Sequence, residues 1–281
     1  MKTDLRKQIL MMYEQANIKG LVKIVSTLDD EAREIILGGI ASQLSETKKK
    51  ALMDKIKSST AVTDQKVRGW LVQGMSSAYV HGLNRSNDLI KKFDINVGKR
   101  ITVEVLKTAP EMRPHLQAVN ALLSDAYLDF GNSMNGFIKG SEHILNDALK
   151  QQIRSEIAIG RLQGTAIDDI MKNVKDTIGQ QGFSVLIDKG GKSWSLDTYS
   201  EMLARPHLLK ANNEAVINRA GDFEIDIVEV SDHNTETPLC QEFEGKIYSI
   251  SGKSDKYPPL PEEPPFHPSC KHSLLLRPDL E

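Results

Sequence analysis

The chain has 281 residues, of which 40% are hydrophobic and 26% are charged, a composition typical of a globular protein with one large domain or two ordinary ones. Aromatic residues make up 5% of the chain, too few for a protein built from stacking platforms for single-stranded nucleic acid. The net charge of −2 is far from that of a dedicated DNA-binding protein.

Two features of the sequence predict a protein that is made in a cytoplasm and has no membrane segment. No apolar run approaches the ~20 residues that a membrane-spanning helix needs. The stretch from Met1 to Gln8 lacks the apolar region of a signal peptide. In a reducing compartment, a disulfide is the less favoured fate of the two cysteines, Cys240 and Cys270.

Charge is distributed unevenly along the chain. Residues 1–150 carry 22 Lys and Arg against 17 Asp and Glu, whereas residues 151–281 carry 14 against 21. Such asymmetry can mark a surface that faces an acidic partner, although ordinary solvated helix faces explain it more simply. The densest basic stretch, Lys48–Lys50 with Lys55 and Lys57, could contact DNA phosphates without sequence specificity.

Residues 1–150 are expected to form helix after helix, because apolar residues recur at intervals of three and four. One stripe runs from Leu5 to Ala16, and Asp29 and Asp30 are expected to cap the helix that follows. The polar run 58–63 predicts an interruption before a long helix that ends near Phe93.

A further helical region is expected after Pro114, with breaks near Gly131 and Gly136. From about residue 150 the pattern becomes mixed. A short helix pair around Gly160 is followed by alternating residues at 183–187 and a second strand at 193–195, and a helix is expected from about Asp197 to Ala220.

The strongest strand signals are the segments 224–230 and 246–250, which are rich in β-branched residues. Six of the chain's 11 prolines then fall between Pro258 and Pro268, in a tail expected to have little regular secondary structure. The sequence therefore predicts an α+β fold: a mostly helical region over residues 1–150, then a small mixed α+β domain over residues 151–281 with a short sheet and a proline-rich tail.

The second half resembles the head-morphogenesis family named after the F protein of phage Mu, in particular its minor capsid branch in phages of Gram-positive hosts. The resemblance covers roughly residues 150–281. After the helix pair around Gly160, the matching segments follow in order: Trp194–Arg205, Ile227–His233, Cys240 with 245–250, and Pro264–His272. The helical first half matches no specific motif, but it is compatible with the resemblance, because such proteins often carry a variable helical N-terminal region.

The resemblance implies a structural minor capsid protein in low copy number in the virion head, present in the host bacterial cytoplasm during assembly. Its partners would be the portal protein and the major capsid protein, with phage DNA as a non-specific contact. It would act in head assembly and in DNA packaging or ejection, without enzymatic turnover.

The sequence departs from the family pattern at two places. Pro206 stands where the family usually has threonine, and proline costs ~3 kcal/mol inside a helix, so the helix is expected to kink or restart near Ala204. Family members often have a second cysteine shortly before the one that matches Cys240, and residues 234–239 contain none.

Four side chains in the C-terminal part have the character of metal ligands: Cys240, His267, Cys270 and His272. Two thiolates and two imidazoles can hold zinc in a tetrahedron, and a structural zinc would stabilise the proline-rich tail. The alternatives are that the cysteines are small buried hydrophobic residues while the histidines bond loop backbone, or that the cysteines form a disulfide.

An enzymatic alternative rests on Asp232 and His233 together with Arg205 and His207. A histidine acid/base and an arginine on a phosphate are the equipment of a metal-independent nuclease, so the alternative is a nuclease- or toxin-like domain on a helical stalk. Convergence of Arg205, His207 and His233 in one cleft would favour it. The simpler interpretation is that Arg205 pairs with a carboxylate and that Asp232 and His233 form a turn after the strand.

Overall fold

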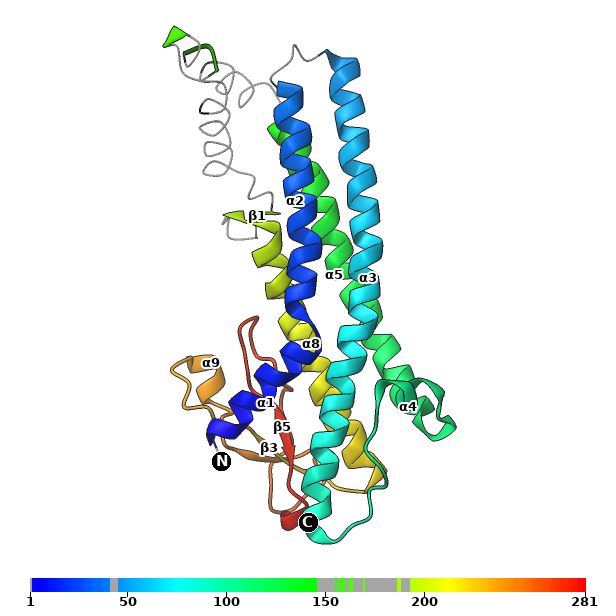
Figure 1. Ribbon diagram of the computed structural model, residues 1–281. Helices are drawn as coiled ribbons and strands as arrows, with labels where there is room; N and C mark the ends of the chain where they lie inside the picture. The colour runs from blue at the N-terminus through cyan, green and yellow to red at the C-terminus, as the bar shows by residue number, and fades with distance from the viewer. Residues whose placement is uncertain are drawn as a thin grey trace. The chain divides into compact units, whose positions relative to one another are not determined.

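The computed structural model describes residues 2–40, 45–145 and 193–281, together with residues 155, 157–159, 162, 163, 169, 186 and 187 (Figure 1). The chain forms two compact units, each assembled from separate stretches of sequence. Unit 1 comprises Met1–Lys19, Trp70–Tyr127 and Met202–Glu281, and unit 2 comprises Gly20–Gly69 and Leu128–Glu201.

Helices dominate the described part of the chain up to residue 145. They are α1 (Lys2–Gln15), α2 (Ile18–Ile40), α3 (Glu46–Ile90), α4 (Val103–Thr108) and α5 (Arg113–Ile144), with short 3₁₀ turns at Lys91–Phe93 and Pro110–Met112. Later in the chain come α8 (Leu196–Asp222), α9 (Pro238–Gln241) and a 3₁₀ turn at Pro278–Leu280. No helix in the described ranges combines the length and the hydropathy that crossing a bilayer requires.

Unit 2 has a helical core. Buried apolar side chains recur at helical spacing on α2, on the first part of α3 and on the second part of α5; they include Leu21, Val25, Leu28, Ile36, Met53, Ile56, Phe130, Met134 and Phe137. Each helix therefore presents one apolar face to the core, as the periodicity predicted.

Several predicted helix boundaries in this region are wrong. Asp29 does not cap a helix, because it lies inside α2, where its carboxylate accepts a hydrogen bond from Arg33 Nε at 2.9 Å, an i,i+4 pair. The run 58–63 does not interrupt α3, because the Thr60 hydroxyl donates to the Ile56 carbonyl at 2.7 Å and so satisfies itself within the helix. The breaks expected near Gly131 and Gly136 are also absent, since α5 runs through both.

Unit 1 contains a three-stranded antiparallel sheet with β3 (Ile227–Val230) between β4 (Ile247–Ser249) and β5 (Leu274–Leu276). Val228 pairs with Tyr248 on one side and with Leu276 on the other. The sheet packs with the second part of α8 and the end of α3 in a core that includes Ile90, Val216, Ala220, Val228, Val230, Tyr248, Leu274 and Leu276. This sheet confirms the α+β fold class and the predicted strands near 224–230 and 246–250.

The proline-dense segment 258–268 forms no helix or strand, as expected, but a strand that the sequence did not predict, β5, follows it. Leu274, Leu275 and Leu276 are all buried, so the segment lacks the alternation by which a half-exposed strand is recognised. Arg85 of α3 fixes this strand, since its guanidinium donates to Ser273 Oγ at 2.9 Å and to the Leu274 carbonyl at 2.5 Å. The Asn213 side chain accepts from the Leu274 N–H at 3.1 Å and donates to the Pro264 carbonyl at 2.9 Å.

The helix α8 continues through Pro206, so the expected restart near Ala204 is wrong. Proline has no backbone N–H, so Pro206 removes one hydrogen-bond donor from the helix while the remaining donors are kept. Burial of Ala204, Leu208 and Leu209 on either side of it favours an unbroken helix.

A small hairpin, β1 (Leu186–Ile187) with β2 (Ser193–Trp194), matches two of the predicted strand segments. Phe183, Val185 and the helix pair around Gly160 fall largely outside the described residues. Within the described ranges every paired strand lies after residue 150, yet both compact units take residues from either side of that position. A domain boundary near residue 150 therefore stays a prediction.

Candidate metal centre

Two segments of unit 1 bring two cysteines and a histidine together. Cys240 lies on the short helix α9, which begins at Pro238, a residue suited to the first helical position. Cys270 closes a turn in which its N–H donates to the His267 carbonyl at 2.9 Å. His272 follows two residues later, directly before β5, and all three side chains are buried.

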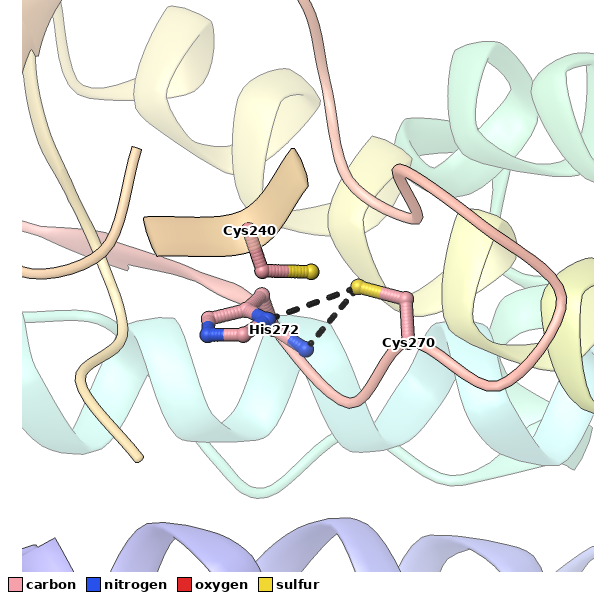
Figure 2. Close-up of side chains that lie close together, drawn as sticks. All are labelled: Cys240, Cys270 and His272. Atoms are coloured by element: carbon pink, nitrogen blue, oxygen red, sulfur yellow. Dashed lines mark hydrogen bonds between the residues drawn. The ribbon is translucent and has the colours of Figure 1, made fainter. Parts of the chain in front are cut away.

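The potential ligand atoms of Cys240, Cys270 and His272 all lie within 4.8 Å of one another. Figure 2 shows the two sulfur atoms pointing toward each other, with the His272 ring beside them. His272 Nδ1 lies 3.5 Å from Cys270 Sγ, and the His272 backbone N–H donates to the same sulfur at 3.4 Å. Neither cysteine is in a disulfide.

The surroundings of the two thiols shift their pKa values in opposite directions. Burial raises the pKa of the Cys240 thiol to about 12, and the neighbouring Cys270 adds to the effect. Burial also opposes ionisation of Cys270, but its hydrogen bonds with His272 outweigh burial and hold the Cys270 pKa below the usual value. Cys270 is therefore the thiol that gives up its proton more readily.

Glu244 supports the far side of the histidine. Its carboxylate lies 3.1 Å from His272 Nε2 and accepts further hydrogen bonds from the backbone N–H groups of His233 and Thr235. Burial would raise the Glu244 pKa, but these hydrogen bonds outweigh it and hold the pKa below the usual value. Sequence reasoning did not single out Glu244, because its spacing from the Cys and His residues follows no ligand motif.

His267 is half-buried and lies next to Cys240, with 3.1 Å between its Nε2 and Cys240 Sγ. It is not part of the group whose ligand atoms lie mutually within 4.8 Å, so at least one of its distances to Cys270 or His272 is longer. Of the predicted metal ligands, the structure thus brings three together tightly and places the fourth against one of them.

A cavity of about 310 Å³ opens beside this group. It is lined by residues of the 233–237 loop and the 267–272 turn, including His233, His267 and His272. Among the described residues that line it, neither Arg205 nor His207 appears, so this cavity does not assemble the nuclease-like set. His233 instead bonds Ser231 Oγ through Nε2 at 2.8 Å, and the Arg205 guanidinium lies over the Tyr13 ring, 5.8 Å from its centroid.

Comparison with known proteins identifies the family. The model of the family described as phage minor capsid protein 2 matches residues 5–273, which include the helices of the first half and the Cys/His group. The chain belongs to this family. It is a structural minor capsid protein of a bacteriophage, in agreement with the resemblance seen in the sequence.

One curated relative is a protein of Lactococcus phage LL-H described as a structural protein. It is 23% identical to the chain over 188 residues, which cover 62% of the chain and 51% of the relative. The chain thus spans about half the length of this relative. No solved structure matches the chain significantly.

Proposed function

We propose that the protein is a low-copy component of the phage head that binds near the portal, contacts the portal and major capsid proteins, and acts in head assembly and in DNA packaging or ejection. The observation that carries the proposal is the family match over residues 5–273, which includes both the helical part and the α+β part of the chain. We further propose that the protein has no turnover of its own.

The exposed apolar side chains of unit 1 support a role in protein contacts. Leu10 and Met11 are neighbours on α1 and are 48% and 52% exposed. Met11 also lines a cavity of about 230 Å³ with Arg85, Arg100 and Asp88, a charged lining of both signs that suits polar side chains of a partner beside the apolar contact. We propose that this part of α1 contacts the portal or capsid protein.

A second contact is proposed for the phage DNA. Lys48, Lys50, Lys55 and Lys57 are exposed on the first part of α3. Glu46 and Asp54 on the same helix limit the local charge, so we expect weak binding that falls steeply with salt.

Quantitative mass spectrometry of purified virions tests the proposal. We expect the protein in heads, at far fewer copies than the major capsid protein, and in complex with the portal protein when the two are produced together. Recovery only as a free protein, absent from heads, would contradict the assembly role.

A pair of variants tests the proposed surface. Met11→Asp should weaken co-purification with the portal or capsid protein at least tenfold, because it places a charge in the apolar contact. Val62→Asp is the matched control, because Val62 is similarly exposed, at 51%, but lies in unit 2. If both variants bind the portal or capsid protein equally well, α1 is not part of the interface.

A further inference from the structure

We propose that Cys240, Cys270 and His272 bind a structural zinc ion, with His267 as the fourth ligand. The proposal goes beyond the capsid role, since it concerns how the C-terminal part of the chain is held together. It rests on the convergence of two buried thiols and a buried imidazole from two segments, the helix α9 and the turn that leads into β5.

The spacing of the ligand atoms fits a tetrahedral site. With zinc–sulfur bonds of about 2.3 Å and zinc–nitrogen bonds of about 2.0–2.1 Å, a tetrahedral angle separates a sulfur and a nitrogen ligand by about 3.5 Å. The distance between Cys270 Sγ and His272 Nδ1 is 3.5 Å. The distance between Cys240 Sγ and His267 Nε2 is 3.1 Å, so that pair needs to open by a few tenths of an ångström.

The tautomer of His272 is fixed in the form that a metal requires. A carboxylate can only accept a hydrogen bond, so Nε2, which faces Glu244, carries the proton. In the neutral ring Nδ1 is then the basic nitrogen, and it is directed at the thiols. Donation from the outer nitrogen of a histidine to a carboxylate is the usual support of a zinc-bound imidazole.

The backbone is arranged to hold a negatively charged sulfur. The His272 N–H donates to Cys270 Sγ, as the dashed line in Figure 2 shows, and such a bond stabilises a thiolate ligand. Zinc would deprotonate Cys240 as well, because a coordinating thiol loses its proton to the ion.

His267, whose Nε2 lies beside Cys240 Sγ, completes the set. It belongs to the same turn as Cys270, so a modest movement of this turn would carry Nε2 to the ion. Two sulfur and two nitrogen ligands in a tetrahedron favour zinc over the harder divalent cations. The ion would join α9, the turn after the proline-rich segment, and the start of β5.

The test uses the full chain without an affinity tag, purified under reducing conditions and reconstituted with zinc. We expect one zinc per chain by elemental analysis, and a thiolate-to-metal charge-transfer band when cobalt replaces zinc. A chelator should lower the melting temperature of the wild-type chain, and this measurement does not depend on any variant folding.

Variants assign the ligands. Cys240→Ser and Cys270→Ser should each lose the metal, and His267→Ala should weaken binding while the cysteine charge-transfer band persists. Glu244→Gln should weaken zinc affinity by about 10- to 100-fold, as expected for a residue that orients a ligand. His143→Gln is the control, since His143 is exposed on α5 and should leave the stoichiometry and affinity unchanged.

Three results would overturn the proposal. One is a folded, reduced wild-type chain that takes up no zinc, and another is a chelator that leaves its melting temperature unchanged. The third is a Cys240–Cys270 disulfide in chains isolated from virions, which would consume both sulfur ligands.

Discussion

Arg85 Nη1 donates to Ser273 Oγ at 2.9 Å, a bond between residues that lie 188 positions apart in the sequence. Arg85 is buried, and its guanidinium donates to two uncharged acceptors, the Ser273 hydroxyl and the Leu274 carbonyl. Burial lowers the Arg85 pKa to about 10, so the group remains charged at neutral pH. Its positive charge is therefore accommodated by neutral acceptors at the start of β5.

Replacing Arg85 should destabilise the fold. Arg85→Ala leaves the Leu274 carbonyl without this donor and opens a cavity, so we expect a loss of roughly 2–4 kcal/mol in the free energy of unfolding. Arg85→Met should lose less, because it restores packing without a buried charge. Urea denaturation measures both. Arg68→Ala, on the exposed face of α3, is the control and should cost at most about 0.5 kcal/mol.

Gly82 marks a close approach of α3 to α8. A Cβ atom at this position would lie 2.3 Å from the Asn212 carbonyl oxygen and 2.8 Å from Ala215 Cβ, so Gly82→Ala forces the helices to move. We expect a loss of roughly 1–3 kcal/mol. At Gly69, in the same helix, a Cβ meets nothing within 4 Å, so Gly69→Ala should instead stabilise by up to about 1 kcal/mol. Thermal melts that rank the two variants in the opposite order would contradict this prediction.

His81 should make stability depend on pH. Burial, with help from Arg85 and Arg100, lowers its pKa from 6.5 to about 4. Because the folded state disfavours the charged form, the contribution of His81 is present above pH 6.5 and is lost as the pH falls toward 4. Near pH 5 the loss should be roughly 2 kcal/mol.

Denaturation of the wild type and of His81→Gln from pH 7.5 to 5 measures this contribution as the difference between the two pH profiles. The comparison is needed because the pKa of His272 is shifted as well. His272 acts in the opposite direction: burial opposes its charged form, but its bonds with Cys270 and Glu244 raise its pKa overall. Parallel profiles would show that His81 does not titrate as expected.

A chain of hydrogen bonds with Tyr79 and His115 buried at its centre links α3, α5 and α8 within unit 1. Asn218 Nδ2 donates to Tyr79 Oη at 2.8 Å, and Tyr79 Oη lies 3.0 Å from His115 Nδ1. His115 Nε2 lies 3.0 Å from Asp222 Oδ2, so the proton on Nε2 leaves Nδ1 to accept from the tyrosine hydroxyl.

Tyr79→Phe removes the central hydroxyl and leaves the buried Nδ1 of His115 without this hydrogen-bond partner. We expect a loss of roughly 1–3 kcal/mol, with a coupling of at least about 0.5 kcal/mol to Asn218→Ala in a double-mutant cycle. Additive losses would mean that the two side chains act independently.

The sequence predicted the helices, and its two wrong boundaries in α2 and α3 have one physical reason. The apolar stripes of α2 and α3 extend through Asp29 and Thr60, but both residue types also favour helix ends. The hydrogen-bond partner of the side chain decides whether the residue ends a helix or lies inside one. Here Arg33 lies one turn after Asp29, and the Thr60 hydroxyl bonds back to Ile56 within the helix. Such i,i+4 pairs can be recognised in the sequence when a continuous apolar face is given more weight than a single residue that favours helix ends.

The candidate site was predicted in part. Cys240, Cys270 and His272 were recognised by their chemistry, and the structure brings them together. Glu244 and Arg85 could not be found, because each acts through contacts across long sequence separations. The strand β5 was missed because a strand buried on both faces has no alternating pattern.

The position of β3 in the sheet has a consequence for synthesis on the ribosome. Residues 227–230 can pair with β4 as soon as residue 249 has emerged, but their other edge stays open until Leu274–Leu276 follow. A chain cut short before Leu274 would expose the unpaired N–H and C=O groups of an apolar strand. Such an open edge can pair with another copy of the chain, which leads to self-association. Premature stop codons between these positions should therefore yield aggregated polypeptide in the producing cell, even though most of the chain has been made.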